Sequence, residues 1–359
     1  MIQVLYLLIF LNYKGCIVID DFKLGNLSIN SDSNTVVIAE AAVEHLGNLN
    51  VAMRMADAAK AIGVDIIKYQ MHIPESEMLP NKIKFWGGSL DEILENYNLS
   101  VSDHEHLIAY CKEIGIQYLC TPFCEEAVGV LNELGVVGFK TGSGELGNLS
   151  MMQAIADTKK PVIISTGMST YEEISLTVDF MKNLNAEFML TNCTSIYPAP
   201  YSQLNLRLIK KLHSDFDVWV GHSDHTPDIW SSLGAVGMGA KVIEKHFTLN
   251  RFMKGPDAEV SLEPNDMRQM VNAIKIIDQA KGDGIKKIQP DEEEVRDWAH
   301  HSVVSIKDIM EGDIINSKQV SVKRPGNGIP AAQLNKVIGS KATTNIKADT
   351  QLSWNDIKA

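Results

Sequence analysis

The sequence predicts an α/β fold, a (β/α)8 barrel followed by a small β-rich domain, and three observations support this prediction. Eight apolar, β-branched runs recur along most of the chain with amphipathic helical patterns between them, which is typical of a parallel sheet built from βα units. The chain has 359 residues, enough for a barrel of roughly 250 residues and a small second module. No GxGxxG turn follows the first run, which argues against an open doubly wound sheet.

The predicted strands come in the order VVIAEAA, DIIKYQM, QYLCTPF, VVGFKTGS, PVIISTG, EFMLTNC, DVWVGHSDH and KVIEKHF. Two of the intervening helices have recognisable starts. One opens on Ser102, and the other has Thr170 three residues before Glu173, as a capping box requires. We therefore expect the barrel to occupy residues 36–280.

Residues 1–35 are predicted to form an N-terminal extension and a hairpin. The stretch MIQVLYLLIFLNYKG lacks a basic region and a cleavage site and is too short to span a bilayer, so we interpret it as a strand or a start-site extension and not as a signal peptide or membrane anchor. The stretch FKLGNLSI suits a hairpin across either end of the barrel.

The C-terminal part divides into a linker and a second domain. Residues 281–298 are charged and contain Gly and Pro, which indicates a linker. Residues 299–359 alternate short strands with turns, so we expect a compact domain small enough to rely on a neighbour for stability.

Charge and cysteine content limit the partners. The net charge of −12 makes nucleic acid or an anionic membrane surface unsuitable as the main partner. Five cysteines without a CxxC pair argue against a disulfide framework or zinc ribbon and favour a reducing, cytoplasmic setting.

Polar residues gather at the ends of the predicted strands, where the chemistry of such barrels is located. They are Glu40, Lys68, Gln70, Thr121, Lys140, Ser143, Glu145, Ser165, Thr166, Asn192, Thr194, Ser195, Tyr197, His225 and His246.

His225 and His246 end two consecutive strands. Neighbouring strands lie about 4.8 Å apart, so two imidazoles there could share one divalent ion that keeps open positions for substrate. A single histidine beside a strand is more often structural, and we expect His222 to be so.

Lys68 and Lys140 lie within apolar strands, where an ammonium group is costly unless it meets an anion or has a shifted pKa. Two interpretations arise: a Schiff-base lysine, as in class I aldolases, or a pair of phosphate-binding cations. The stretch KTGSGE favours phosphate binding, because Gly142 and Gly144 let backbone N–H groups approach an anion.

Two further residues lie on turns. Gly255 and Pro256 form a turn that would present Asp257 to the barrel mouth, although a plain surface turn explains it equally well. Arg324 lies on the glycine-rich loop VKRPGNG and gains a role only if that loop reaches an active site.

These motifs together resemble the sialic acid synthase family, which condenses phosphoenolpyruvate with an N-acetylated amino sugar. The resemblance extends over residues 20–359, in order, through CTPF, FKTGSGEL, ISTGMST, NCTSIYPAPY, GHSDHT, IEKHFTL, KGPDAEVSLEP and VKRPGNGI. It implies that the second domain is similar to type III antifreeze proteins (a SAF domain). It also implies a domain-swapped homodimer in which Arg324 enters the partner's active site.

The resemblance also implies roles for individual residues. His225 and His246 would bind Mn²⁺ or Mg²⁺, and Glu40 or else Glu145 would be the catalytic carboxylate. Gln70, Asp257 and Arg324 would face the sugar. Phosphoenolpyruvate would be held by Lys68, Thr121, Lys140, Ser143, Ser165, Ser195 and Tyr197.

Departures and rivals remain. The loop AVEHLG replaces the family's GxNHNG, with Ala42, Glu44 and Leu46 at the differing places, and Ser195 replaces a frequent asparagine. N-acetylmannosamine is the expected sugar, with a diacetamido sugar leading to legionaminic or pseudaminic acid as the alternative. A class I aldolase using Lys140 is a more distant rival. An antifreeze role is disfavoured, because the last domain carries many lysines and fold alone does not establish function.

Overall fold

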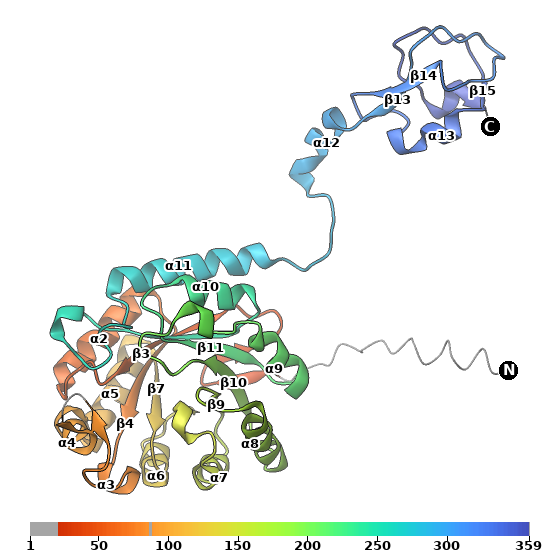
Figure 1. The fold of residues 1–359 in the computed structure, drawn as a ribbon. Helices are drawn as coiled ribbons and strands as arrows, with labels where there is room; N and C mark the ends of the chain where they lie inside the picture. Colours follow the sequence, from red (N-terminus) through yellow and green to blue (C-terminus); the bar gives the residue numbers. More distant parts are fainter. Residues whose placement is uncertain (1–20, 86–87, 359) are drawn as a thin grey trace, which may run out of the picture. The chain divides into compact units, whose positions relative to one another are not determined.

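The structure is a computed structural model that describes residues 21–85 and 88–358 (Figure 1). The stretch MIQVLYLLIFLNYKG, predicted to be a strand or a start-site extension, lies outside these residues. The chain divides into two compact units between Gly282 and Asp283, within the stretch predicted as a linker. Each unit is described by itself.

The first unit is the predicted (β/α)8 barrel. Its parallel strands are hydrogen-bonded in the order β7-β4-β3-β12-β11-β10-β9-β8, and the two end strands, β7 and β8, also lie in contact. The strands are β3 (Val36–Ala42), β4 (Ile66–Met71), β7 (Gln117–Pro122), β8 (Phe139–Lys140), β9 (Val162–Ser165), β10 (Phe188–Cys193), β11 (Val220–Asp224) and β12 (Val242–His246).

Helices follow the strands and lie outside them (Figure 1). They are α2 (Leu49–Ile62), α5 (Val101–Ile114), α6 (Glu125–Glu133), α7 (Leu149–Asp157), α8 (Tyr171–Asn183), α9 (Leu208–Phe216), α10 (Trp230–Gly237) and α11 (Pro264–Lys281). An insertion between β4 and α5 holds α3 (Pro74–Glu77), β5 (Lys84–Phe85), β6 (Gly88–Ser89) and α4 (Leu90–Tyr97).

The two predicted helix starts had different outcomes. Thr170 and Glu173 form the expected capping box at α8. The predicted start of α5 at Ser102 was wrong, because Ser100 is the N-cap and exchanges hydrogen bonds with Asp103. Ser100 has extended backbone angles, so its hydroxyl reaches back to the free N–H groups of the first turn.

The hairpin of β1 (Phe22–Leu24) and β2 (Leu27–Ile29) closes the amino-terminal end of the barrel. Phe22, Leu24 and Ile29 are buried against Val36 and Val242, the first residues of β3 and β12. Burial of each such side chain contributes about 2 kcal/mol. The hairpin therefore plugs the floor of the barrel and leaves the mouth, at the carboxyl ends of the strands, open.

The second unit has its own small core. Its elements are α12 (Glu293–Ala299), β13 (Ser302–Ser305), β14 (Val320–Lys323), α13 (Leu334–Val337), β15 (Lys341–Ala342) and β16 (Ile357–Lys358). The core includes Val303, Ile309 and Leu352, all fully buried. Helix α12 begins within the stretch predicted as a linker, residues 281–298, and ends one residue beyond it, so that stretch is not wholly irregular.

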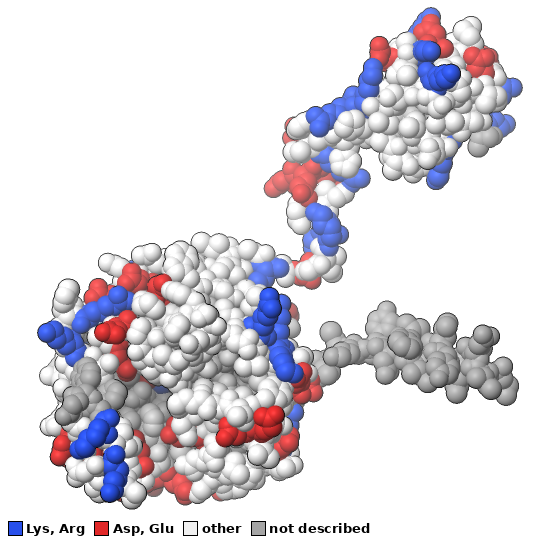
Figure 2. Space-filling model, in the orientation of Figure 1, with Lys and Arg blue, Asp and Glu red and all other residues white. Residues whose placement is uncertain are grey.

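Acidic and basic residues are interspersed on the face of the barrel shown in Figure 2. Such a mixed surface offers no extended cationic track for a polyanion on this face. Within the described part of the chain, the helices are too short or too polar to cross a bilayer.

Candidate active site

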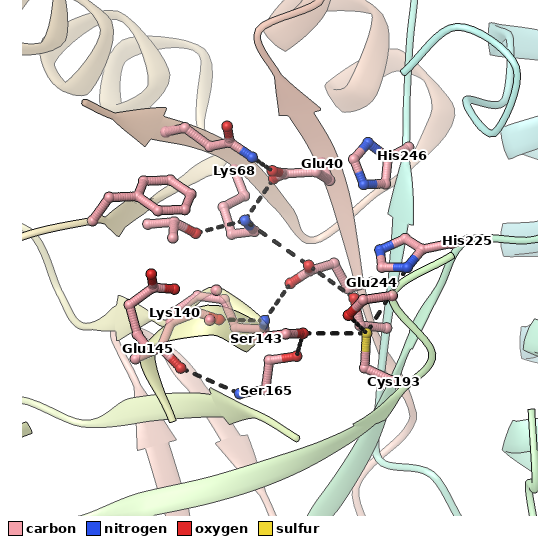
Figure 3. Close-up of a pocket in the computed structure, with 18 of the residues that line it drawn as sticks. Glu40, Lys68, Lys140, Ser143, Glu145, Ser165, Cys193, His225, Glu244 and His246 are labelled. Carbon is pink, nitrogen blue, oxygen red and sulfur yellow. Dashed lines mark hydrogen bonds and ion pairs between the residues drawn. The ribbon is translucent and has the colours of Figure 1, made fainter. Parts of the chain in front are cut away.

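A cavity of about 330 Å³ lies at the carboxyl ends of the barrel strands. It brings together the barrel residues that were given a catalytic, metal-binding or substrate-binding role, except Asp257, whereas Thr166, Asn192 and Thr194 from the same strand ends do not line it. Those that line it are Glu40, Lys68, Gln70, Thr121, Lys140, Ser143, Glu145, Ser165, Ser195, Tyr197, His225 and His246. Figure 3 shows the labelled side chains among them, such as Glu40, Lys140 and His225, converging from different strands on one space.

Two lysines and two glutamates form a buried charge cluster on the cavity floor. Lys68 Nζ lies 2.7 Å from Glu40 Oε2 and 3.9 Å from Glu244 Oε1. Lys140 Nζ lies 3.6 Å from Glu244 Oε2. Lys68 also donates a 2.7 Å hydrogen bond to Thr121 Oγ1. The four formal charges cancel, which offsets part of the cost of burying them.

The pKa shifts follow from this arrangement. Burial opposes the charge of Lys68, but Glu244 and Glu40 outweigh it and raise its pKa, so Lys68 is an ammonium ion. Burial would raise the pKa of Glu244, but Lys140 and Lys68 lower it, so Glu244 is ionised between them. Burial raises the pKa of Glu40, opposed by Lys68. A charged Lys68 suits anion binding and is a poor nucleophile for a Schiff base.

Sequence reasoning missed Glu244. It was interpreted as part of a buried strand, yet it precedes His246 by two residues, so both side chains point to the same face of β12. That alternation, together with a carboxylate inside an apolar strand, was the available signal. Glu244 Oε1 also accepts a 3.1 Å hydrogen bond from Ser223, a second lining residue that was not predicted.

Hydroxyl groups and close backbone line the side of the cavity near β9. Ser143 Oγ and Ser165 Oγ lie 2.8 Å apart. A Cβ atom on Gly167 would lie 2.4 Å from Ser195 Oγ and 2.5 Å from Ser143 Oγ, so only glycine allows these hydroxyls to approach. The three serines form a group of neutral donors beside the lysines.

Cys193 lines the cavity beside these serines and was also not predicted. Its Sγ is 3.6 Å from Ser143 Oγ and 3.9 Å from His225 Nδ1. Burial would raise the pKa of the thiol, but His225 and Ser143 lower it to about 7.

His225 and His246 face each other with ring centroids 5.3 Å apart. Nδ1 of His225 lies 2.8 Å from the Thr194 carbonyl oxygen, so it carries the proton and leaves Nε2 free to bind. Nδ1 of His246 is buried without a hydrogen-bond partner and lies 3.5 Å from Asp257 Oδ2. Tyr197 stacks on His225 with its centroid 4.1 Å away.

The imidazole nitrogens of His225 and His246 fit a divalent ion that keeps further coordination positions open. An imidazole that donates its other N–H to a carbonyl is the usual second-shell arrangement of a metal-binding histidine. Within residues 21–85 and 88–358, no group of three or more His, Cys, Asp or Glu side chains forms a complete metal site. Further ligands would therefore come from substrate or water.

Asp257 lies beside this cavity, in a second one of about 620 Å³ formed by residues 254–260 with Arg251 and Tyr197. Its backbone N–H donates a 2.8 Å hydrogen bond to Glu44 Oε1. Burial, followed by the nearby Glu44, raises the pKa of Asp257 to about 7. Glu44 is one of the departures noted in the sequence, and it holds the loop that carries a predicted sugar-binding residue.

Glu145 lies on the opposite side, after β8. Burial, followed by repulsion from Glu77, raises its pKa to about 7, and its Oε2 is buried without a hydrogen-bond partner. A carboxyl group with that pKa could donate or accept a proton near neutral pH.

Arg324 belongs to the second unit and is described only there. It lies on the loop after β14, where its Nε donates a 2.9 Å hydrogen bond to the Ala299 carbonyl oxygen. Its guanidinium also lies over the Trp298 ring, 5.8 Å from the centroid.

Comparison with known proteins identifies the relatives of this chain. The NeuB family model matches residues 55–286, and the SAF domain model matches residues 300–358. The N,N'-diacetyllegionaminic acid synthase of Campylobacter jejuni is 38% identical over 326 residues, covering 88% of this chain and 98% of that protein. The N-acetylneuraminate-9-phosphate synthase of Homo sapiens is 32% identical over 322 residues, covering 87% and 90%.

A solved structure agrees. The N-acetylneuraminic acid synthetase of Leptospira borgpetersenii, in complex with citrate, superposes with a TM-score of 0.73 at 31% identity, covering 77% of this chain and 95% of that one. The fold, the cavity and these relatives lead to one conclusion: this chain belongs to the NeuB family of synthases, which form a carbon–carbon bond with phosphoenolpyruvate, and it carries a SAF domain.

Proposed function

We propose that this enzyme condenses phosphoenolpyruvate with the open-chain form of N-acetylmannosamine, giving N-acetylneuraminate and phosphate. The observation that carries the proposal is the cluster of Lys68, Lys140 and Glu244 beside His225 and His246. Two buried ammonium groups suit the phosphate and carboxylate of phosphoenolpyruvate, and the histidines lie at the edge where a second substrate would enter.

A diacetamido sugar is the second candidate, leading to legionaminic or pseudaminic acid. It is favoured by the greater identity to the Campylobacter jejuni legionaminic acid synthase than to the human enzyme. One or two groups in a pocket suffice to change such a preference, and the cavity beside Asp257 is the place where the two sugars would differ in their contacts.

The lysines and serines would hold the first substrate. When phosphoenolpyruvate binds, the ammonium groups of Lys68 and Lys140 would turn from Glu40 and Glu244 toward its phosphate and carboxylate oxygens. Ser143 and Ser165 would donate hydrogen bonds to the same oxygens. The released carboxylates then face the substrate, where positive charge develops at C2 as the enol carbon attacks the sugar aldehyde. Preorganised carboxylates stabilise such charge without reorganisation.

The carboxylate of Glu40 is the first choice for the water step. It would orient a water molecule, accept one of its protons as the oxygen adds to C2, and so give a tetrahedral intermediate. As phosphate departs with cleavage of the C2–O bond, the C2 hydroxyl gives its proton to the phosphate and becomes the keto group, and the proton held by Glu40 passes to the new sugar alkoxide. Glu145 is the second choice, because its pKa of about 7 suits proton transfer.

Mn²⁺ or Mg²⁺ would be held by His225 and His246. A divalent ion there would supply Lewis-acid polarisation of the aldehyde oxygen. The hydrogen bond from His225 to Thr194 and the packing of Tyr197 on the ring hold this histidine in place for that purpose.

A homodimer is part of the proposal. Large apolar side chains are exposed on segments that follow barrel strands: Met168, after β9, is 72% exposed, Trp230, the first residue of α10, 67%, and Phe252, after β12, 87%. Large exposed apolar side chains that follow the carboxyl ends of strands are typical of a surface that another protein covers. We take its occupant to be a second copy of this chain, which would bring Arg324 to the sugar.

The cytoplasm is the proposed location. Cys111, Cys120, Cys124 and Cys193 are buried free thiols, and free thiols suit a reducing compartment.

A product assay tests the reaction. Purified enzyme with phosphoenolpyruvate and Mn²⁺ is offered N-acetylmannosamine and then the diacetamido sugars, and phosphate release and product mass are measured. Conversion of N-acetylmannosamine that a chelator abolishes supports the proposal, and conversion of only a diacetamido sugar moves it to the second candidate. Borohydride trapping of Lys140 with substrate would instead favour the aldolase.

A further inference from the structure

A chain of hydrogen bonds leads from the cavity into the protein along β4. Gln70 Nε2 donates to Glu40 Oε1 at 2.7 Å, and Gln70 Oε1 lies 3.1 Å from His72 Nε2. His72 Nδ1 in turn lies 2.9 Å from Glu77 Oε2 on α3. Glu40 and Gln70 line the cavity, whereas His72 and Glu77 lie behind them.

The direction of these hydrogen bonds follows from the first contact. Glu40 lies 2.7 Å from the ammonium group of Lys68, and an ionised carboxylate only accepts hydrogen bonds. The amide atom that faces Glu40 must therefore be the nitrogen of Gln70. The amide oxygen then faces His72, so His72 Nε2 must donate a proton to it.

The contacts of His72 Nδ1, on the other side of the imidazole ring, require a proton on that nitrogen as well. Nδ1 of His72 faces both oxygens of the Glu77 carboxylate, at 2.9 and 3.1 Å. Both ring nitrogens thus face acceptors, and a histidine satisfies two acceptors only when each nitrogen carries a proton. Glu77 supplies the compensating negative charge.

Packing holds the ring in this position. The His72 ring stacks on Phe123 with centroids 4.2 Å apart and an interplanar angle of 15°, and Phe123 lines the cavity. Asn98 Nδ2 donates to the His72 carbonyl oxygen. His72 is only 6% exposed, so water does not compete for its hydrogen bonds.

We propose that His72 is a positioning residue for the synthase reaction, locking the amide of Gln70 so that its N–H donor faces Glu40. This inference rests on the proposed function, in which Glu40 activates the water molecule and Gln70 faces the sugar. Without the His72 donor, the amide of Gln70 is free to rotate and present its oxygen to Glu40. Glu40 then loses a hydrogen bond and a defined orientation.

A double-mutant cycle tests this role in the full-length enzyme. His72→Phe keeps the stacking on Phe123 and removes both N–H donors. We expect kcat to fall about 10- to 100-fold, as is usual for groups that orient a reacting side chain, while KM for phosphoenolpyruvate stays within about two-fold, because Lys68 and Lys140 are untouched.

The cycle separates positioning from general structure. In a Gln70→Ala background, His72→Phe should lower kcat little further, because the amide that His72 orients is absent. An equal fall of kcat in both backgrounds would overturn the proposal. Glu77→Gln should lower kcat in the same direction as His72→Phe, whereas Glu75→Gln on the same helix, where Glu75 is exposed outside the cavity, serves as the matched control and should have no effect.

An NMR measurement reads the protonation without any turnover. With ¹⁵N-labelled histidine, the wild-type enzyme should show an Nε2–H signal that exchanges slowly with water and disappears in His72→Phe. A neutral His72 without a proton on Nε2 would contradict the proposal. In that case Gln70 would donate to His72, and a protonated Glu40 would donate to the oxygen of Gln70. If no sugar is converted, the proposed function fails, and this signal still decides the inference about His72.

Discussion

Ala42, the last residue of β3, and Leu46, in the loop that follows, adopt left-handed backbone conformations with φ of 45° and 53°. This region costs a residue with a Cβ atom roughly 1–2 kcal/mol relative to the right-handed region. Both positions are among the departures from the family's loop pattern, and Ala42 stands where that pattern has glycine. The loop that carries Glu44 and His45 therefore contains local strain that the surrounding barrel must offset.

A pair of glycine substitutions tests this strain. Ala41→Gly should lower the free energy of unfolding by about 1 kcal/mol, because glycine loses more backbone entropy on folding. Ala42→Gly pays the same entropy but relieves the left-handed strain, so its net effect should be close to zero or stabilising. Urea unfolding of the two variants measures the difference. A loss in Ala42→Gly as large as that in Ala41→Gly would contradict the prediction.

At the scale of elements, alternation along the strands explains the site. Glu244 and His246 on β12, like Lys68 and Gln70 on β4, point into the barrel, while Lys245 points out and forms a buried ion pair with Asp224 at 3.3 Å. The hairpin β1–β2 fills the lower end of the barrel with apolar side chains. Polar chemistry is thereby restricted to the mouth.

Two buried histidines connect the loop after β3 with α5. Nε2 of His45 and Nε2 of His104 are buried without hydrogen-bond partners, while His104 Nδ1 lies 2.7 Å from the Tyr118 hydroxyl. Burial lowers the pKa of each to about 4 from an ordinary value of 6.5; for His45 the nearby His104 adds to the effect. Both side chains are therefore neutral in the folded protein at neutral pH.

This arrangement predicts acid sensitivity. A histidine whose folded pKa is depressed binds its proton more readily in the unfolded chain, so stability is complete above pH 6.5 and falls as the pH drops toward 4. Over this window each histidine should cost up to about 3 kcal/mol.

Chemical unfolding at pH 7 and pH 5 measures the effect. His104→Gln should lose less stability between these two pH values than the wild-type enzyme, and His106→Gln on the exposed side of α5 is the matched control. An unchanged pH dependence in His104→Gln would count against the prediction.

At the scale of the whole molecule, large apolar side chains are exposed after the carboxyl ends of barrel strands, and the arginine predicted to complete the site lies in the other unit. A domain-swapped homodimer would meet both requirements, because the second unit of one copy would cover the mouth of the other. The small core of the second unit would gain stability from the same contact.

Complementation between two inactive variants tests this arrangement. When Lys140→Ala and Arg324→Ala chains are co-expressed, half of the randomly formed dimers are mixed, and each mixed dimer has one intact site only if Arg324 acts across the interface. We expect about a quarter of wild-type activity for a symmetric two-chain assembly. Arg324 acting within its own chain would leave the mixture inactive.

The sequence by itself determined the barrel, the second domain and most of the cavity lining. Eight apolar runs and the rule that barrel chemistry lies at the carboxyl ends of strands were sufficient for residues such as Lys68, Lys140 and His246. These predictions succeeded because period-two alternation and strand ends are local properties of the chain. The roles assigned to these residues stay predictions.

Only the tertiary structure decided how these groups are paired. Glu244 lies between two lysines that come from other strands, and the N–H of Asp257 reaches Glu44, 213 residues away along the chain. The orientation of Gln70 depends on His72 and Glu77, and the capping residue of α5 on backbone angles at Ser100. Which charges share a buried space depends on how the parallel sheet closes into a barrel. Closure brings together residues from different strands, and their separation in the sequence does not predict the distance between them.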